Sequence, residues 1–228
     1  MGYRDAVLAD SPVSYWPLTE TSGTTAVDAV AAHNGTYTGS YAQNAATVLV
    51  GTSVPSTNFT GGYVNLGDNA AYSPQAGASG LLTLECIWNP STVSGTQMLM
   101  AKSDSGGSEY QFYASGSVLV IQIQQGNYVD ICATSGGTLV AGANHHLVTT
   151  YDRAAGIVDL WINNVQVASS TAMTGTSADT ATALNLSARV GLLNAAGLLA
   201  HCALYGSRLS AAKIASHFRE SLRGGVSY

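Results

Sequence analysis

The chain has 228 residues and a formal net charge of −5 at pH 7, with 46% hydrophobic residues and only 9% charged ones. Ordinary globular chains are about 25% charged, so we expect hydroxyl and amide side chains to cover the polar faces of this protein. The eight Lys and Arg residues are too few for the cationic surface that nucleic acid or an anionic membrane requires as a partner. No apolar run of the sequence reaches the length of a membrane span.

The order of the predicted elements is one of many short strands separated by turns. Residues 3–10 predict one or two helical turns, and residues 13–18 predict a strand whose Pro17 places it at an edge or a strand end. Residues 20–40 are polar and rich in turn residues. Further strands are expected at 63–66, 81–89, 97–102, 110–114, 118–124, 128–133, 184–192 and 198–205. Because no linker or internal repeat interrupts this series, it predicts one all-β domain over residues 1–228.

The strand predicted at 118–124 shows the clearest alternation. Leu119, Ile121 and Ile123 share one face, while Gln122 and Gln124 lie on the other. Such a strand buries one face in a core and presents an amide-rich surface on the opposite side.

Residues 146–169, HLVTTYDRAAGIVDLWINNVQVAS, predict three antiparallel strands joined by two tight turns. The second turn, Asn163-Asn164, suits a two-residue hairpin because Asn tolerates the positive φ that a type I′ turn needs. After the last predicted strand, Ser210 is a good N-cap for a helix over residues 211–222. Ile214 and Phe218 lie on one side of this helix, which we expect to pack against the strands.

The opening residues and the cysteines bear on the cellular compartment. The start, MGYRDAVLADSP, lacks the basic region and apolar core of a signal peptide. Cys86, Cys132 and Cys202 form no close-spaced metal or redox motif, so we expect buried free thiols, with one disulfide plus one free thiol as the alternative. An odd number of cysteines without a leader favours a chain made in a reducing cytoplasm, or assembled into a particle there.

Five segments resemble, in sequence order, those of laminin-G-like, concanavalin A-like jelly rolls. They are YRDAVLADSPVSYWPLTETSG, FTGGYVNLGD, LTLECIWNP, HHLVTTYDRAAGIVDLWINNVQVAS and ALYGSRLSAAKIASHF. The resemblance implies a two-sheet antiparallel jelly-roll sandwich with a short C-terminal helix. The opening segment is similar to versions of this domain in bacterial surface proteins and in tail or capsid proteins of bacteriophages.

Many relatives of this type hold calcium partly through an Asp in the last strand. In the matching run of this chain, Ala200 and His201 stand where the acids are expected. Because calcium needs several oxygen ligands, the resemblance implies no cofactor, although calcium remains possible. Asp28 lies where relatives carry an Asp and a polar loop, and we retain it as a candidate metal ligand, with a turn residue as the alternative.

Hydrolases on this kind of sandwich need two carboxylates close together. Their E-x-D-x-E pattern is absent around each glutamate of this chain, and Glu85 or Asp159 would each face a cleft alone. The neighbouring His145 and His146 point to opposite faces of a strand, so they are poorly placed to share a metal. The chain is therefore predicted not to be an enzyme.

Sugar recognition would use aromatic rings flanked by amides, because pyranose rings stack on aromatic faces and hydroxyls need hydrogen-bond partners. Aromatic and amide side chains cluster along one hairpin region and are expected to line the concave face. The candidate glycan-binding residues are Tyr110, Tyr113, Gln122, Gln124, Asn127 and Tyr128.

Three functions remain after these exclusions. The first is a non-enzymatic structural or adhesion module of a phage virion, either a capsid decoration or a tail-associated protein. This module would be made in the host cytoplasm and would contact other virion proteins and further copies of itself. The second is a carbohydrate-binding adhesin domain that recognises cell-surface polysaccharide from an extracellular or bacterial-surface location. The third is a polysaccharide hydrolase.

Overall fold

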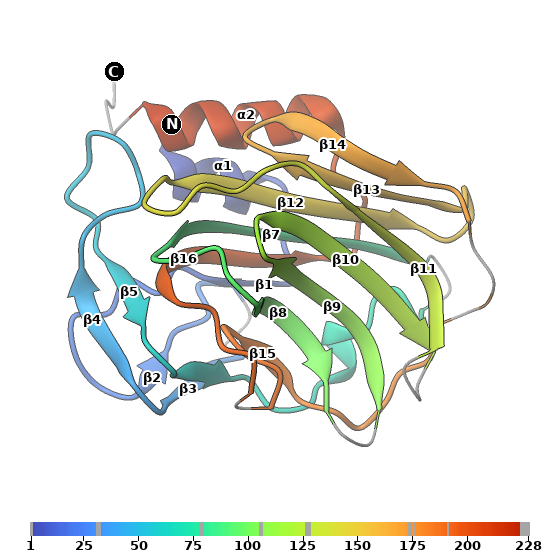
Figure 1. The fold of residues 1–228 in the computed structure, drawn as a ribbon, viewed down its shortest axis with the longest axis horizontal. Coiled ribbons are helices and arrows are strands. Elements are labelled where there is room, and N and C mark those ends of the chain that lie inside the picture. Colours follow the sequence, from blue (N-terminus) through green and yellow to red (C-terminus); the bar gives the residue numbers. More distant parts are fainter. Residues whose placement is uncertain are drawn as a thin grey trace.

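The computed structural model describes residues 2–30, 33–77, 80–104, 107–125, 129–172, 175, 177–190 and 192–223. Two antiparallel sheets face each other as a sandwich (Figure 1). Sheet A contains β14 (Val165–Ser170), β13 (Ile157–Ile162), β12 (His145–Asp152), β7 (Leu81–Pro90), β16 (Gly197–Tyr205), β5 (Ser56–Phe59) and β4 (Tyr41–Ala45) in that spatial order, and β1 (Ser14–Trp16) also pairs with β16. Sheet B contains β11 (Val129–Gly136), β10 (Val118–Gln125), β9 (Ser108–Ser115), β8 (Thr96–Ser103), β15 (Leu184–Leu186), β6 (Tyr63–Asn65), β3 (Gly35–Thr38) and β2 (Thr25–Ala26). The helices are α1 (Tyr3–Ala9), the 3-10 helix η1 (Ala70–Tyr72) and α2 (Ala211–Leu222).

The core lies between the two sheets and follows the alternation of the strands. In β7, Leu84 and Trp88 point inward and are fully buried. In β10, Leu119, Ile121 and Ile123 meet them from sheet B, as the sequence predicted. The predicted two-sheet fold is confirmed.

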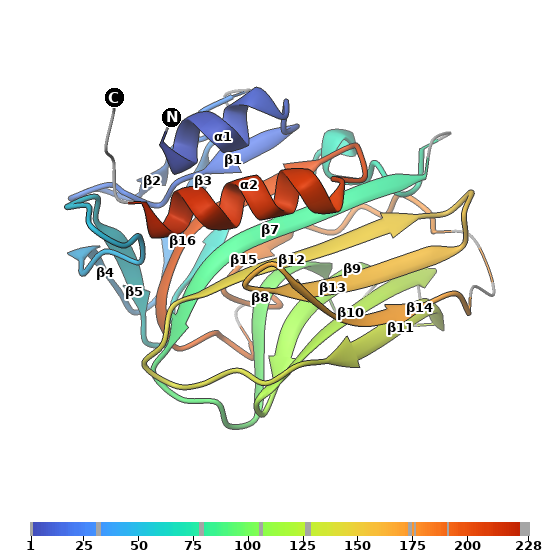
Figure 2. The same cartoon turned by 90° about the horizontal axis from the view of Figure 1, so that it is seen from above.

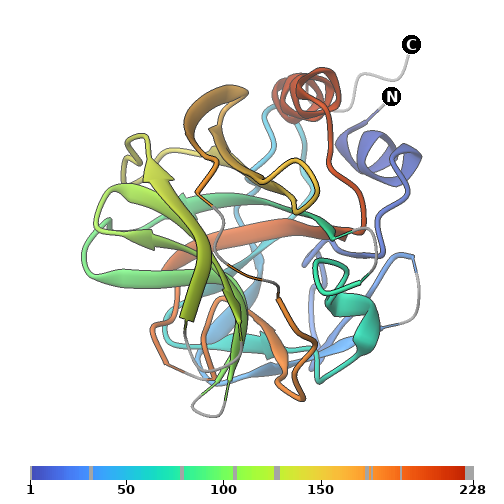
Figure 3. The ribbon, with the colours of Figure 1, turned by 90° about the vertical axis from the view of Figure 1, so that its right-hand side faces the viewer.

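A second apolar layer lies on the outer face of sheet A, where α1 and α2 lie side by side (Figure 2). Ser210 caps α2 by accepting a hydrogen bond from the Lys213 amide, and Ile214 is fully buried under the helix. In the end view of Figure 3, the helices lie on one side of the molecule and strands β8–β11 on the other. Within the described ranges, no helix covers the outer face of β8–β10.

A buried carboxylate joins the two helices to sheet A. Glu85 of β7 points outward into the helix layer and has no solvent exposure. Its oxygens accept hydrogen bonds from the hydroxyls of Tyr3 and Tyr205, both at 2.8 Å, and from Nε2 of His146 at 2.6 Å. Nδ1 of His217, on α2, lies 3.0 Å from both oxygens. The carboxylate therefore contacts α1, β12, β16 and α2 together.

His217 carries a positive charge in this cluster. Its second nitrogen, Nε2, lies 3.1 Å from the Ala6 carbonyl and 3.1 Å from an Asp10 carboxylate oxygen. Both ring nitrogens face acceptors, so both must be protonated. Burial lowers the pKa of His217, but the hydrogen bond to Glu85 and the charges of Glu85 and Asp10 outweigh it and raise the pKa overall. The same pairing keeps the pKa of Glu85 below its usual value, although burial acts in the opposite direction.

Several other expectations can be compared with the structure. Asn163 and Asn164 both adopt positive φ, at 52° and 66°, which confirms the predicted turn. Cys86 and Cys202 are buried free thiols, as expected, whereas the side chain of Cys132 lies outside the described part. The strand predicted at 184–192 is much shorter, and strands β2–β5 were not predicted because their short polar segments lack a clear apolar alternation. Across the described ranges, no helix is long and apolar enough to cross a bilayer.

Replacing His217 with Gln is predicted to lower the free energy of unfolding at pH 6 by about 3 kcal/mol, because it breaks a buried ion pair and leaves Glu85 charged. The folded-state pKa of His217 is raised, so its contribution is fully present below about pH 6.5 and is lost as pH rises through that folded-state pKa. The difference in the free energy of unfolding between wild type and H217Q, measured by urea titration, should therefore shrink from pH 6 to pH 9. His145→Gln is the control, because His145 contacts the Val140 backbone rather than Glu85. A constant H217Q deficit across this pH range would contradict the charged pairing.

Candidate functional site

A hollow of about 390 Å³ lies on the outer face of sheet B, over β8, β9 and β10. Eight of the residues that line it are uncharged, three of them glutamines, and the ninth is an arginine. They are Thr96, Met98, Gln111, Tyr113, Ser115, Gln122, Gln124, Arg189 and Leu193. Arg189 and Leu193 come from the segment after β15, which pairs with the start of β8 through Met98.

The register of the strands places amides in one row across this face. Gln122 of β10 lies opposite Gln111 of β9, and Gln111 lies opposite Ala101 of β8. The row continues through Asn185 of β15 to Asn65 of β6. Gln111, Ala101 and Asn185 are 4%, 0% and 1% exposed, so only Gln122 and Asn65, at the two ends of this row, are accessible to a ligand.

Hydrogen bonds fix the floor of the hollow. Gln111 and Gln124 are only 4% and 3% exposed, and Nε2 of Gln111 donates to Oε1 of Gln124 at 2.8 Å. Tyr113 and Gln122 are partly exposed above them. The site therefore combines a fixed amide floor with one accessible aromatic ring.

Three of the predicted glycan-binding residues, Tyr113, Gln122 and Gln124, come together in this hollow. The prediction for Tyr110 was wrong, because this side chain is fully buried in the core and its hydroxyl donates to the Tyr72 carbonyl at 2.9 Å. Residues three apart in a strand face opposite ways, so Tyr110 and Tyr113 cannot line one face. The remaining two predicted residues, Asn127 and Tyr128, lie outside the described residues.

Six residues that line the hollow were not predicted from the sequence, and Gln111 and Arg189 among them differ in the signal that was available. The alternation of YQFY in β9 could have identified Gln111, since it shares a face with Tyr113. Arg189 had no comparable local signal, because the segment that carries it reaches the hollow only through tertiary pairing with β8.

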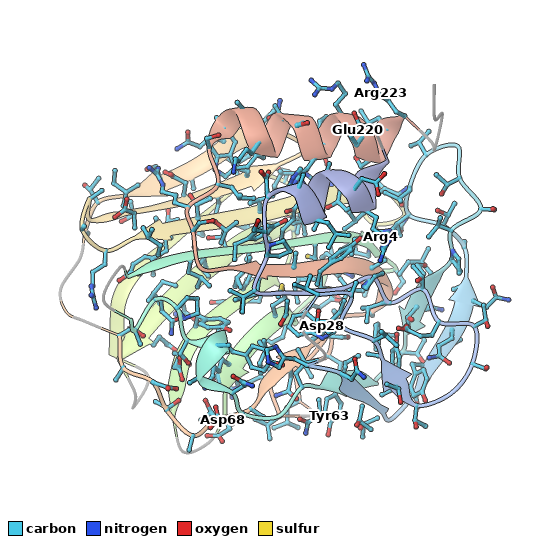
Figure 4. All side chains as sticks on the ribbon, turned by 180° about the vertical axis from the view of Figure 1, so that it is seen from behind. Arg4, Asp28, Tyr63, Asp68, Glu220 and Arg223 are labelled. Carbon is cyan, nitrogen blue, oxygen red and sulfur yellow. The ribbon has the colours of Figure 1, made fainter. Side chains whose placement is uncertain are left out.

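The candidate metal ligand, Asp28, lies in the loop between β2 and β3 (Figure 4). It is 6% exposed, and one of its oxygens accepts hydrogen bonds from the backbone amides of Tyr15 and Val30, both at 3.0 Å. The other oxygen accepts from the His33 amide at 3.3 Å. Both oxygens thus organise the turn, and no group of three or more His, Cys, Asp or Glu side chains suited to a metal occurs among the described residues.

The last strand places His201 where relatives would carry an acid. His201 is 3% exposed, and its Nδ1 lies 2.6 Å from the Tyr15 hydroxyl. Burial lowers the pKa of His201 to about 4, so the ring is neutral at pH 7. A buried neutral imidazole that pairs with a tyrosine hydroxyl has a packing role in this strand.

Several solved structures share this fold. The binding domain of botulinum neurotoxin DC in complex with SialylT superposes with a TM-score of 0.65 at 12% identity, covering 95% of this chain and 53% of that one. The botulinum neurotoxin serotype G binding domain superposes with a TM-score of 0.66 at 8% identity, covering 92% of this chain and 51% of that one. The covalent intermediate of Trypanosoma rangeli sialidase with 2,3-difluorosialic acid superposes with a TM-score of 0.65 at 13% identity, covering 95% of this chain and 34% of that one. The chain thus spans between a third and about half of these proteins, and at such low identity the likeness shows the fold alone.

The sequence itself identifies the family. No curated protein sequence matches the chain. Residues 56–215, well over half of the chain, match the sequence profile described as the concanavalin A-like lectin/glucanases superfamily. This region includes β5 to β16, and with them most strands of both sheets and all residues named for the hollow. The chain belongs to the concanavalin A-like lectin/glucanases superfamily.

Proposed function

We propose that the chain is a non-enzymatic carbohydrate-binding module, and that the hollow on the outer face of sheet B contacts an oligosaccharide. The observation that carries this proposal is the partly exposed Tyr113 ring beside the amides of Gln111, Gln122 and Gln124. Aromatic faces accept sugar rings, and amides pair with their hydroxyls. The hydrogen bond between Gln111 and Gln124 holds two of these amides in place before binding, which lowers the entropy cost of association.

The chemistry of the hollow supports binding without catalysis. Among the described residues its lining contains no Asp or Glu, whereas glycoside hydrolysis generally uses a pair of carboxylates that flank the bond to be cleaved. Glu85, which the sequence offered as a lone carboxylate, lies on the other sheet, where its oxygens accept hydrogen bonds from Tyr3, His146 and Tyr205 under the two helices. Two of the similar proteins are described in complex with a sugar ligand, SialylT in one and 2,3-difluorosialic acid in the other.

Tyr113→Ala is predicted to weaken binding on a glycan array and in titration calorimetry by about fivefold, because it removes the aromatic platform, which we expect to contribute about 1 kcal/mol. The matched control is Tyr63→Ala, a partly exposed tyrosine of β6 in the same sheet that does not line the hollow (Figure 4). An array without any binding, or equal affinities for Y113A and wild type, would contradict the proposal.

The second candidate is a structural module of a phage virion that acts through contacts with other virion proteins or further copies of itself. The opening segment resembles phage versions of the domain, and three aliphatic side chains next to the hollow are solvent-exposed. They are Val190, Leu192 and Leu193, at 50%, 63% and 40% exposure. Exposed aliphatic groups on a surface of low charge suit protein contacts. In this role the chain would lie on the particle rather than on a bacterial surface.

Mass spectrometry of purified particles of the encoding phage tests this second role. The chain should be present at a constant ratio to the major capsid or tail protein through successive density gradients, because a structural contact persists during purification. A soluble host-expressed control protein should be lost over the same steps. Absence of the chain from the purified particles would rule out a virion role.

A further inference from the structure

A groove of about 700 Å³ lies on the outer face of sheet A, beside the start of α2. Its floor is formed by β12, β13 and β14, and its wall by the segment that leads into α2. Asp159 and Trp161 lie two residues apart on the outward face of β13, and Gln166 of β14 lies opposite Trp161. This groove is separate from the hollow on sheet B, because the two lie on different sheets and no described residue lines both.

Asp159 is the polar centre of this groove. It is only 3% exposed, and its Oδ1 accepts a hydrogen bond from Nε2 of Gln166 at 2.9 Å. Its Oδ2 accepts from Nη2 of Arg208 at 2.5 Å and from the Thr150 hydroxyl at 3.4 Å. The nearly buried carboxylate thus holds the Arg208 guanidinium and the Gln166 amide in place, and these two exposed groups present hydrogen-bonding atoms that are already oriented toward a hydroxyl-bearing ligand.

Trp161 supplies an apolar ring beside this polar group. Of the three tryptophans of the chain, Trp16 and Trp88 are fully buried, and Trp161 alone is partly exposed. An aromatic ring flanked by fixed hydrogen-bonding groups in a groove has the composition of a saccharide site. Among the described residues, the charged side chains of the groove are Asp152, Asp159 and Arg208, two acids and one base, which together carry a net charge of −1.

From these contacts we propose that the groove is a second saccharide-binding site and that it takes an uncharged sugar. The net negative charge disfavours sialic and uronic acids, while the Asp159 cluster pairs with neutral hydroxyls. With one site on each sheet, a single chain can bind two glycan strands, which raises avidity on a surface that presents many copies.

Trp161 fluorescence gives a direct test on the full chain. Acrylamide quenching reports mainly on Trp161, since the other two tryptophans are buried. The probes are cellotriose, laminaritriose, maltotriose and triacetylchitotriose, with sialyllactose as the anionic comparison. At least one neutral trisaccharide should lower the quenching constant about twofold, and sialyllactose should leave it unchanged. No protection by any neutral probe, or equal protection by sialyllactose, would overturn the proposal.

Two variants separate this site from general effects on folding. Trp161 packs partly against the helix layer, so the exposed Gln166 is the better target. Gln166→Ala should raise the trisaccharide concentration needed for protection about tenfold, while the control Val165→Ala, on the same hairpin outside the groove, should not. Tyr113→Ala should keep the protection, which distinguishes this site from the hollow on sheet B. Wild-type behaviour of Q166A would overturn the proposal.

Discussion

The burial of the Glu85 carboxylate is the interaction on which the arrangement of this molecule depends. A charge with no solvent exposure is costly unless every lone pair has a donor. Here the donors come from α1, β12, β16 and α2. The carboxylate therefore joins both ends of the described chain to sheet A. The outer face of β8–β10 and the β13–β14 edge of sheet A stay outside this contact, and the hollow and the groove lie at these two places.

The low content of charged residues also determines the chemistry of the surface. With only 9% charged residues, several ionic groups are directed inward rather than into solvent. The Lys102 ammonium contacts Glu109 at 2.7 Å, and both side chains are fully buried. Amide, hydroxyl and aromatic groups remain for the accessible faces. A neutral surface of this kind gains little from salt-dependent steering, so recognition on it depends on shape, stacking and hydrogen bonds.

The sequence predicts those features that depend on local rules. Leu119, Ile121 and Ile123 face the core because strand side chains alternate, and Asn163-Asn164 forms its turn because Asn tolerates positive φ. The same rule, applied strictly, would have removed Tyr110 from the predicted glycan face. The short polar strands β3 and β5 escaped prediction because they pair with strands that follow later in the chain, β6 and β16, and β2 and β4 were missed with them because they pair with β3 and β5.

The contacts between distant segments were beyond local rules. His217 was predicted only as part of a helix, yet it is the charged partner of Glu85, 132 residues away. The sequence held one hint of this pairing. Glu85 lies between Thr83 and Ile87 on the non-core face of β7, and His217 follows Ile214 by three residues on α2. The groove around Trp161 needed Arg208 from the far end of the chain, and no spacing in the hairpin indicates that residue.

We propose that ligand binds the amide-rich outer face of sheet B over β8–β10, which no helix of the described residues covers. An NMR titration of the ¹⁵N-labelled chain with the tightest glycan from the array tests it most directly. We expect the largest amide shifts in β9 and β10, around Tyr113 and Gln122, with little change in α1 and α2. Shifts confined to the two helices, with β8–β10 unchanged, would contradict the account.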